Sequence, residues 1–318
     1  MKLKGKRAII TGSSSGIGRA AALLFAAEGA QVVVNARGSR ADGVGAIDAV
    51  VQEIRARGGI AVGIPGAVDD PTFAANLVEC CVDAFGGVDI LVNNAAVYSE
   101  EGIGRVDRCS FESWRQIMSV NLDAVFNLCR AALPHMIAQG SGRILNAGSF
   151  AGTGKMGGSA YSASKSALFG LTRAMAADYG PYGVTVNCYN PEAVSDMGGM
   201  EDQQVFDDSI RHWEEKGFRS PAESAYLLGL GGPEGIAPWL AYLCSDQADY
   251  INGNIFAVEA RRIALLAWPE EEKALYRDAA AQGPWTLTQL EAIAPLAFPL
   301  VNRWPPLKGE ALRKWEAA

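Results

Sequence analysis

Histidine and long hydrophobic runs are scarce in this chain of 318 residues. It holds two histidines, and no apolar run approaches the roughly 18 residues that a membrane-spanning helix needs. The 28 lysines and arginines are outnumbered by 35 acidic residues, which gives a net charge of −7. Such a balance offers no broad positive surface for nucleic-acid phosphates. We therefore expect a soluble, cytoplasmic protein that binds a small molecule and has neither a membrane span nor a nucleic-acid partner.

Cysteines are also few, and their spacing matches no metal-binding motif. Most of them lie inside apolar stretches that read as helices or strands. This placement predicts reduced thiols in the core, with no metal site. The six positions are Cys80, Cys81, Cys109, Cys129, Cys188 and Cys244.

Apolar, β-rich segments recur through the first 260 residues and alternate with helical patterns. Continuous runs of valine and isoleucine indicate strands covered on both faces, and the helices between them favour parallel crossovers. The sequence therefore predicts an α/β fold of Rossmann type, a doubly wound parallel seven-stranded sheet with helices on both faces. The expected strands lie at residues 7–11, 31–36, 59–64, 88–94, 142–148, 184–190 and 254–259.

This alternation assigns residues 1–261 to one domain of Rossmann type. Within it, residues 192–235 depart from the rhythm and predict a mobile helical flap. Residues 262–318 form a C-terminal extension, in which Thr288 and Glu291 fit a capping box for a short helix. The extension holds too many large apolar side chains to remain free, so we expect it to pack on the domain or on a partner subunit.

A glycine-rich segment, TGSSSGIG at residues 11–18, follows the first expected strand and opens a helix. Gly12 permits a tight turn, Gly16 lets backbone approach a pyrophosphate, and Gly18 allows close packing of helix on strand. The N–H groups at the helix start favour an anion there. A plain turn is the alternative. The expected dinucleotide-binding residues of the segment are Gly12, Ser14, Ser15, Gly16, Ile17 and Gly18.

The segment YSASK places Tyr161 and Lys165 one helical turn apart, on the same face of a helix. A phenol has an ordinary pKa of about 10, and a neighbouring ammonium favours its ionised form. The pair could therefore carry a proton. By itself, such a pair is more often two solvated surface side chains.

Five motifs in order, TGSSSGIG, NNAA at 93–96, Asn121, GSFAG at 148–152 and YSASK, resemble the short-chain dehydrogenase/reductase family over residues 5–260. Within that family, stretches such as VVVNARG and PEGIAPWLAYLC look like (3R)-hydroxyacyl-CoA dehydrogenase and hydroxysteroid dehydrogenase members. The resemblance implies an oxidoreductase that transfers hydride between a nicotinamide coenzyme and a secondary alcohol or ketone. The expected substrate is lipophilic, a 3-hydroxyacyl or 3-ketoacyl thioester or a steroid-like molecule, as in lipid or steroid metabolism.

The resemblance also implies catalytic roles. Tyr161 would exchange a proton with the substrate oxygen, and Lys165 would hold the nicotinamide ribose. Ser149 would fix the same oxygen, and Asn121 would anchor a water that links Lys165 to solvent. Ser149 precedes Tyr161 by twelve positions, whereas the family usually has thirteen, the position of Gly148 here.

The second strand ends at Ala36, where an acidic residue would select NAD, and Arg37 and Arg40 follow. A guanidinium there can pair with a 2′-phosphate, which favours NADP, with NAD still possible. Gly66 stands where many relatives have an aspartate near adenine. A solvated loop charge is the alternative for Arg37.

The remaining coenzyme contacts that the resemblance implies come from two loops. Asn93 and Ala95 would contact the adenosine half, Asn93 through its backbone and amide. Pro191 and Val194 would lie beside the nicotinamide. Glu192 and Asp196 replace the family's usual glycine and threonine there.

Apolar residues of the flap, together with Val97 and Tyr98, could line a substrate pocket or pack in the core. The helical runs 111–138 and 159–179 resemble the family's subunit contacts, which favours a homodimer or homotetramer. Two rival functions are a non-catalytic dinucleotide-binding scaffold, and a lyase or epimerase that uses bound nicotinamide transiently.

Overall fold

The computed structural model describes residues 1–38, 43–154, 157–193, 203–215, 231–267 and 285–297, together with residues 220, 221, 224, 225 and 228. The chain divides into two compact units, Met1–Leu266 and Ala267–Ala318. The first unit contains the sheet. The described part of the second contains one helix, α11 (Leu287–Ala297).

The sheet has eight strands in the order β3-β2-β1-β4-β5-β6-β7-β8. Its seven parallel strands are the seven expected from the sequence, each within a few residues of its predicted bounds. Chain order reverses between β1 and β4, so the crevice at this switch point lies beside the glycine-rich turn after β1. The parallel strands are β1 (Arg7–Ile10), β2 (Gln31–Ala36), β3 (Ile60–Pro65), β4 (Ile90–Asn93), β5 (Gly142–Ala147), β6 (Val184–Pro191) and β7 (Ile255–Glu259).

The eighth strand, β8 (Arg262–Leu265), corrects the expectation of seven. It runs antiparallel to β7, with Phe256 opposite Leu265 and Glu259 opposite Arg262. Only its inner edge is paired within the first unit, and most of its side chains are exposed, although residues 263–268 read as a short apolar run, IALLAW. The strand also explains why the first unit ends at Leu266 rather than at residue 261.

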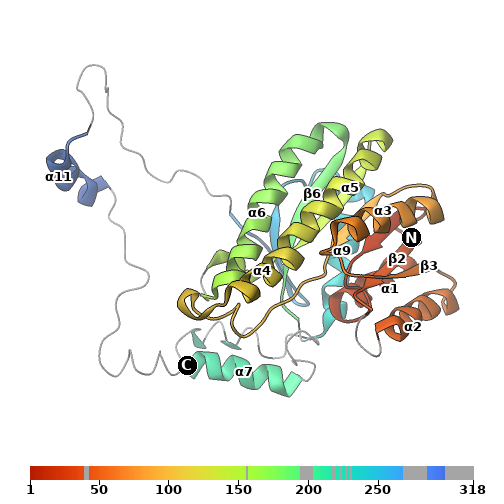
Figure 1. Cartoon of the computed structure of the whole chain (residues 1–318), viewed down its shortest axis with the longest axis horizontal. Helices are drawn as coiled ribbons and strands as arrows, with labels where there is room; N and C mark the ends of the chain where they lie inside the picture. The colour runs from red at the N-terminus through yellow and green to blue at the C-terminus, as the bar shows by residue number, and fades with distance from the viewer. Residues whose placement is uncertain are drawn as a thin grey trace. The chain divides into compact units, whose positions relative to one another are not determined.

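Helices cover both faces of the sheet (Figure 1). One apolar core packs α1, α2 and α9 against one face, and a second packs α3, α5 and α6 against the other. Because both faces are covered, the strands read as continuous hydrophobic runs. No helix in the described residues is long and apolar enough to cross a membrane. The helices are α1 (Gly16–Ala27), α2 (Gly43–Ala56), α3 (Pro71–Phe85), α4 (Phe111–Met118), α5 (Ala124–Gln139), α6 (Ser159–Tyr179), α7 (Gln203–Glu215) and α9 (Ala237–Leu243).

In the stretch expected to form a flap, the structure describes the helix α7, and much of the remainder lies outside the described residues. In the second unit, the capping box of α11 lies two residues before the expected one. Thr286 and Gln289 form it, with the Gln289 N–H 3.3 Å from Thr286 Oγ1 and the Thr286 N–H 3.1 Å from Gln289 Oε1. The helix starts at Leu287, so Thr288 and Glu291 lie inside it and cannot cap it.

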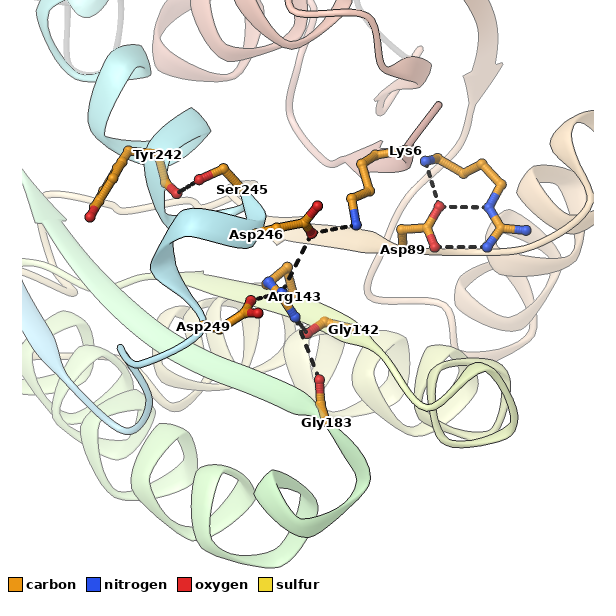
Figure 2. A network of polar contacts seen from close by, with 10 residues as sticks. Lys6, Asp89, Gly142, Arg143, Gly183, Tyr242, Ser245, Asp246 and Asp249 are labelled. Atoms are coloured by element: carbon orange, nitrogen blue, oxygen red, sulfur yellow. Dashed lines mark hydrogen bonds and ion pairs between the residues drawn. The ribbon is translucent and has the colours of Figure 1, made fainter. Parts of the chain in front are cut away.

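A polar network joins the starts of β1 and β5 to the segment after α9 (Figure 2). Arg143 is buried at the start of β5 and donates to Asp249, with Asp246 at 3.8 Å. Lys6 also binds Asp246, at 2.7 Å. This network lies at the N-terminal edge of the parallel strands, whereas the glycine turn lies at the C-terminal edge.

All six cysteines are free thiols. Cys81, Cys129, Cys188 and Cys244 are buried, and Cys80 and Cys109 are partly exposed. Burial raises the pKa of the thiols of Cys81, Cys129 and Cys188 to about 12.

Candidate active site

The glycine-rich turn has no room for side chains at two of its glycines. A Cβ on Gly12, whose φ is +62°, would lie 2.9 Å from Ala95 Cα. A Cβ on Gly18 would lie 2.3 Å from the Gly12 carbonyl oxygen, so only glycine lets α1 start this close to β1. Gly16 has φ +52° and begins α1. This close turn at a helix N-terminus is the cradle that a pyrophosphate requires.

Two buried hydroxyls, which the sequence analysis did not single out, fix this turn. Thr11 Oγ1 accepts hydrogen bonds of 3.0 Å from the N–H groups of Asn94 and Ala95. Ser13 donates to the Ile10 carbonyl oxygen at 2.6 Å and accepts from the Asn35 N–H at 3.0 Å. They join the loop after β1 to β2 and to the loop after β4, and only their contacts distinguish them from the other small residues of the motif.

Other expected coenzyme residues surround the turn. Ser14 and Ile17 are half-buried, and Ser15 is exposed. Arg37 is exposed directly after β2, and no ion pair involves it among the described residues. Arg40, Val194 and Asp196 lie outside the described residues, whereas Pro191 ends β6 opposite Val258.

The Phe73 ring lies against Gly66, the position where many relatives have an acid near adenine. A Cβ on Gly66 would lie 2.0 Å from that ring, so a side chain there would require the ring to move.

Asn93 ends β4, and its side chain is directed into the protein. The side chain is buried, and the amide donates to Asn146 Oδ1 at 2.9 Å and to Cys129 Sγ at 3.3 Å. The amide thus ties β4 to β5, which leaves the backbone of Asn93 for the expected contact with the adenosine half. The adjacent Asn94 lies nearer the turn, since its amide donates to the carbonyl oxygens of Thr11 and Gly12 at 3.0 and 3.2 Å.

The structure brings Tyr161 and Lys165 together on α6. The Lys165 ammonium lies 5.7 Å from the centre of the Tyr161 ring. It is buried and donates to the carbonyl oxygen of Ala147, the last residue of β5, at 2.7 Å. Lys165 therefore reaches from the helix to the C-terminal edge of the sheet, where the glycine turn also lies.

Ser149 lies on the loop after β5, and its side chain forms a hydrogen bond with Tyr161. Its hydroxyl also accepts from the Ala151 N–H at 3.2 Å. Gly148, the alternative at the usual spacing, cannot carry a side chain, because a Cβ there would lie 2.2 Å from Asn190 Oδ1. The shorter spacing is therefore accommodated with Ser149 against the tyrosine.

Asn121 lies in a π-helical turn, Ser119–Asp123, between α4 and α5. Its amide binds the Val97 backbone in both directions, accepting from the N–H at 2.8 Å and donating to the carbonyl oxygen at 2.9 Å. It also donates to Ser164 Oγ, at 3.3 Å, on the catalytic helix. Asn121 thus joins the loop after β4 to α6.

Burial governs the electrostatics of Tyr161 and Lys165. Burial raises the pKa of the Tyr161 phenol above its ordinary value; the hydrogen bond with Ser149 opposes this, and the nearby Tyr98 phenol adds to it. Burial also lowers the pKa of the Lys165 ammonium to about 8, against a smaller opposing effect of the Cys188 thiol. Desolvation thus outweighs, at this distance, the attraction by which the Lys165 ammonium favours the ionised phenol.

Known proteins are similar in sequence to this chain over most of their length. The family model for short chain dehydrogenase matches residues 6–204, more than half of the chain. A (2S)-[(R)-hydroxy(phenyl)methyl]succinyl-CoA dehydrogenase subunit of Thauera aromatica is 33% identical over 264 residues, which cover 81% of this chain and 96% of the relative. A 3-oxoacyl-[acyl-carrier-protein] reductase of Staphylococcus aureus is 35% identical over 255 residues, with coverage of 80% and 96%.

A solved structure resembles the fold as well. The short chain dehydrogenase from Burkholderia cenocepacia in complex with NADP superposes with a TM-score of 0.69 at 32% identity and covers 82% of this chain and 98% of its own. Together with the tyrosine, lysine and serine at the C-terminal edge of the sheet, these matches establish that the chain belongs to the short-chain dehydrogenase family of nicotinamide-dependent oxidoreductases.

Proposed function

We propose that this enzyme interconverts a 3-ketoacyl thioester and its 3-hydroxyacyl form, with NADP(H) as coenzyme. The observation that carries the catalytic part is the placing of Tyr161, Ser149 and Lys165 around one point beside the glycine turn. The coenzyme supplies or accepts the hydride. The chain's own residues then have to bind the substrate oxygen and move one proton.

In this proposal Tyr161 donates its phenolic proton to the carbonyl oxygen during reduction and takes it back during oxidation. The raised pKa keeps the phenol protonated at neutral pH, which suits donation. Ser149 holds the same oxygen with its hydroxyl. Lys165 binds the nicotinamide ribose, and Asn121 keeps the neighbouring loop and helix in register and anchors the water that returns protons.

Coenzyme choice follows from the end of β2. Ala36 offers no carboxylate to the adenosine ribose, and Arg37 is exposed and free of ion pairs within the described residues, so it can meet a 2′-phosphate. The NADP in the Burkholderia cenocepacia structure supports the same choice. Gly12, Ser14, Ser15, Gly16, Ile17 and Gly18 would hold the pyrophosphate, with backbone of Asn93, Ala95, Pro191 and Val194 around the rest.

The coenzyme assignment can be tested by exchanging the two positions. The double change Ala36→Asp with Arg37→Leu should move the ratio of kcat/KM from NADP toward NAD, because it removes the phosphate partner and adds a ribose acceptor. A wild-type protein that strongly prefers NAD would overturn the assignment.

The substrate class rests on the names of relatives and on the apolar character of the flap. One relative is a dehydrogenase of a CoA thioester and another reduces a 3-oxoacyl thioester. A steroid-like alcohol is the second candidate. A scaffold without turnover is less well supported because Ser149, Tyr161 and Lys165 are all present and brought together. A lyase or epimerase would use the same residues and is separated by the absence of net change in the coenzyme.

Assembly and location belong to the same proposal. Phe111 on α4 and Phe126 on α5 are 77% and 52% exposed, which favours a homodimer or homotetramer built on these helices. Six free thiols favour the reducing cytoplasm. We also propose that the extension packs on the first unit or on a partner subunit.

The experiment that tests the function measures absorbance of NADPH with 3-oxooctanoyl-CoA, and with a steroid ketone as the second substrate. Tyr161→Phe should retain its fold and coenzyme binding but lose at least about 100-fold in kcat. Tyr182→Phe makes the same chemical change at an exposed position and should keep full activity. Near wild-type kcat in Tyr161→Phe, or product without net change in the coenzyme, would overturn the proposal.

A further inference from the structure

The first turn of the catalytic helix is capped by another segment. The N-cap residue of α6 is Gly158, which has no side chain to accept from the free N–H groups of the first turn. Instead, the Ser159 N–H donates to the Gly104 carbonyl oxygen at 3.0 Å, and the Tyr161 N–H donates to the Gly102 carbonyl oxygen at 3.1 Å. The backbone of the catalytic tyrosine is therefore held by the loop that follows β4.

This loop, residues 97–104 and here named the Tyr98 loop, is itself anchored at two points. Asn121 binds both backbone groups of Val97. Ser99 forms a hydrogen bond with Ser113 on α4, and its hydroxyl also accepts from the Gly102 N–H at 3.0 Å. The Gly102 carbonyl that faces Tyr161 thus has its place set from α4 and from the π-helical turn.

The same loop carries an aromatic ring to the catalytic phenol. The ring centres of Tyr98 and Tyr161 are 6.5 Å apart at an interplanar angle of 78°, an edge-to-face contact. Tyr98 is half-buried, so its ring is partly accessible from outside. The Tyr161 ring therefore has two close partners, the Lys165 ammonium and the Tyr98 ring.

We propose that Tyr98 is a positioning residue for Tyr161, and that the Tyr98 loop sets both the ring and the backbone of the catalytic tyrosine. The inference rests on the proposed role of Tyr161 as proton donor. The contact is made by the rings, so the shape of the Tyr98 side chain matters more than its hydroxyl. A tyrosine whose ring can rotate or shift spends less time aligned with the substrate oxygen, which lowers kcat without changing coenzyme binding.

The test compares Tyr98→Ala, Tyr98→Phe and Tyr161→Phe, with 3-oxooctanoyl-CoA and NADPH for kcat and KM and with an NADPH fluorescence titration for the coenzyme Kd. Tyr98→Ala should lower kcat about tenfold while the coenzyme Kd stays within about twofold. Tyr98→Phe keeps the ring and should recover most of the kcat. Full kcat in Tyr98→Ala, or equal losses in the Ala and Phe variants, would overturn the role of the ring.

Different results would contradict the proposed function of Tyr161 and the proposed role of Tyr98. An active Tyr161→Phe removes the proposed function, whereas an inactive Tyr161→Phe beside a fully active Tyr98→Ala removes only the role of Tyr98.

A second variant tests the loop without touching Tyr98. A Cβ on Gly102 would lie 2.0 Å from Cδ1 of the buried Ile117 and 3.0 Å from Ser99 Oγ, so Gly102→Ala has to shift the Ile117 side chain or the loop whose carbonyl holds Tyr161. We expect a lower kcat with an unchanged coenzyme Kd. Gly170→Ala is the matched control on α6, because nothing lies within 4 Å of its Cβ. Wild-type kcat in Gly102→Ala would contradict the positioning role of the loop.

Discussion

Replacing Lys165 by methionine should abolish activity and yet stabilise the coenzyme-free fold at neutral pH. Lys165 is 2% exposed, and no carboxylate forms an ion pair with it among the described residues. Burial lowers the pKa of its ammonium from 10.5 to about 8. At about 1.4 kcal/mol for each pH unit, keeping this group charged in the folded protein costs roughly 3 kcal/mol at pH 7.

Part of the stability that Lys165→Met gains by removing the buried charge is offset by a lost hydrogen bond. Methionine cannot donate to the Ala147 carbonyl oxygen, and a buried acceptor without its partner costs about 1 kcal/mol or more. The expected net effect is a free energy of unfolding about 2 kcal/mol larger in Lys165→Met at pH 7. The catalytic lysine would then be a place where the fold gives up stability for function.

The pH dependence provides the sharper test. Between pH 8 and 10.5 the unfolded lysine holds more protons than the folded one, so stability from this group rises with pH across that window. The advantage of the variant should shrink accordingly and be close to zero by about pH 9.5. Buried cysteines titrate in the opposite sense in both proteins, so their effect largely cancels in the difference.

The assay is urea unfolding of both proteins without coenzyme, at pH 7.0 and 9.5, with equal m-values as a check that the same transition is compared. Tyr161→Phe serves as an inactive control that keeps the lysine. A wild type more stable than Lys165→Met at pH 7, or a difference that does not change with pH, would refute this reasoning.

Three further changes test other parts of the structure. Arg143→Met should lower the free energy of unfolding by about 2 kcal/mol, because a buried cation and its hydrogen bonds are lost. Asp249→Asn, at a carboxylate that is 65% exposed, should lower it by less than about 1 kcal/mol. Equal shifts in the melting temperatures of the two variants would contradict this difference. Gly148→Ser should lower activity by collision with Asn190, and a double variant with Ser149→Ala that regains activity would show that Ser149 is misassigned. Deleting residues 267–318 should raise KM for apolar substrates and should lower the melting temperature or disrupt oligomers, with little change in coenzyme affinity. A truncated protein with unchanged KM, melting temperature and assembly state would show that the extension is dispensable.

Local patterns account for what the sequence could predict. The glycine turn and the Tyr161–Lys165 pair are each encoded within a few residues, and the seven parallel strands carry the continuous apolar runs that burial on both faces requires. The eighth strand was not predicted, although residues 263–268 read IALLAW, because its antiparallel pairing with β7 continues no alternation of strand and helix along the chain. The sequence does not distinguish Thr286 from Thr288 as the cap, because each is followed three residues later by Gln289 or Glu291, which could complete a capping box.

Long-range contacts account for the rest. Asn93 belongs to the expected NNAA motif, but its partners Asn146 and Cys129 come from other elements, so its buried amide could not be foreseen. Tyr98 meets Tyr161 only because the loop after β4 reaches the start of α6. Burial also decides whether the pKa of the Tyr161 phenol rises or falls. The sequence gives the spacing of Tyr161 and Lys165 along a helix but not how far each is removed from solvent.

The rate at which the four buried cysteines react with a thiol reagent reports how often the folded structure opens. The thiols of Cys81, Cys129 and Cys188 are buried, and burial also raises their pKa to about 12, so alkylating reagents reach a reactive thiolate only when the fold opens. Cys80 and Cys109 are partly exposed and should react first. The slower labelling of the buried thiols, after Cys80 and Cys109 have reacted, then measures how often the structure opens. Peptide mapping at Cys188, whose thiol interacts with Lys165, would report how often the interior beside the catalytic lysine admits solvent.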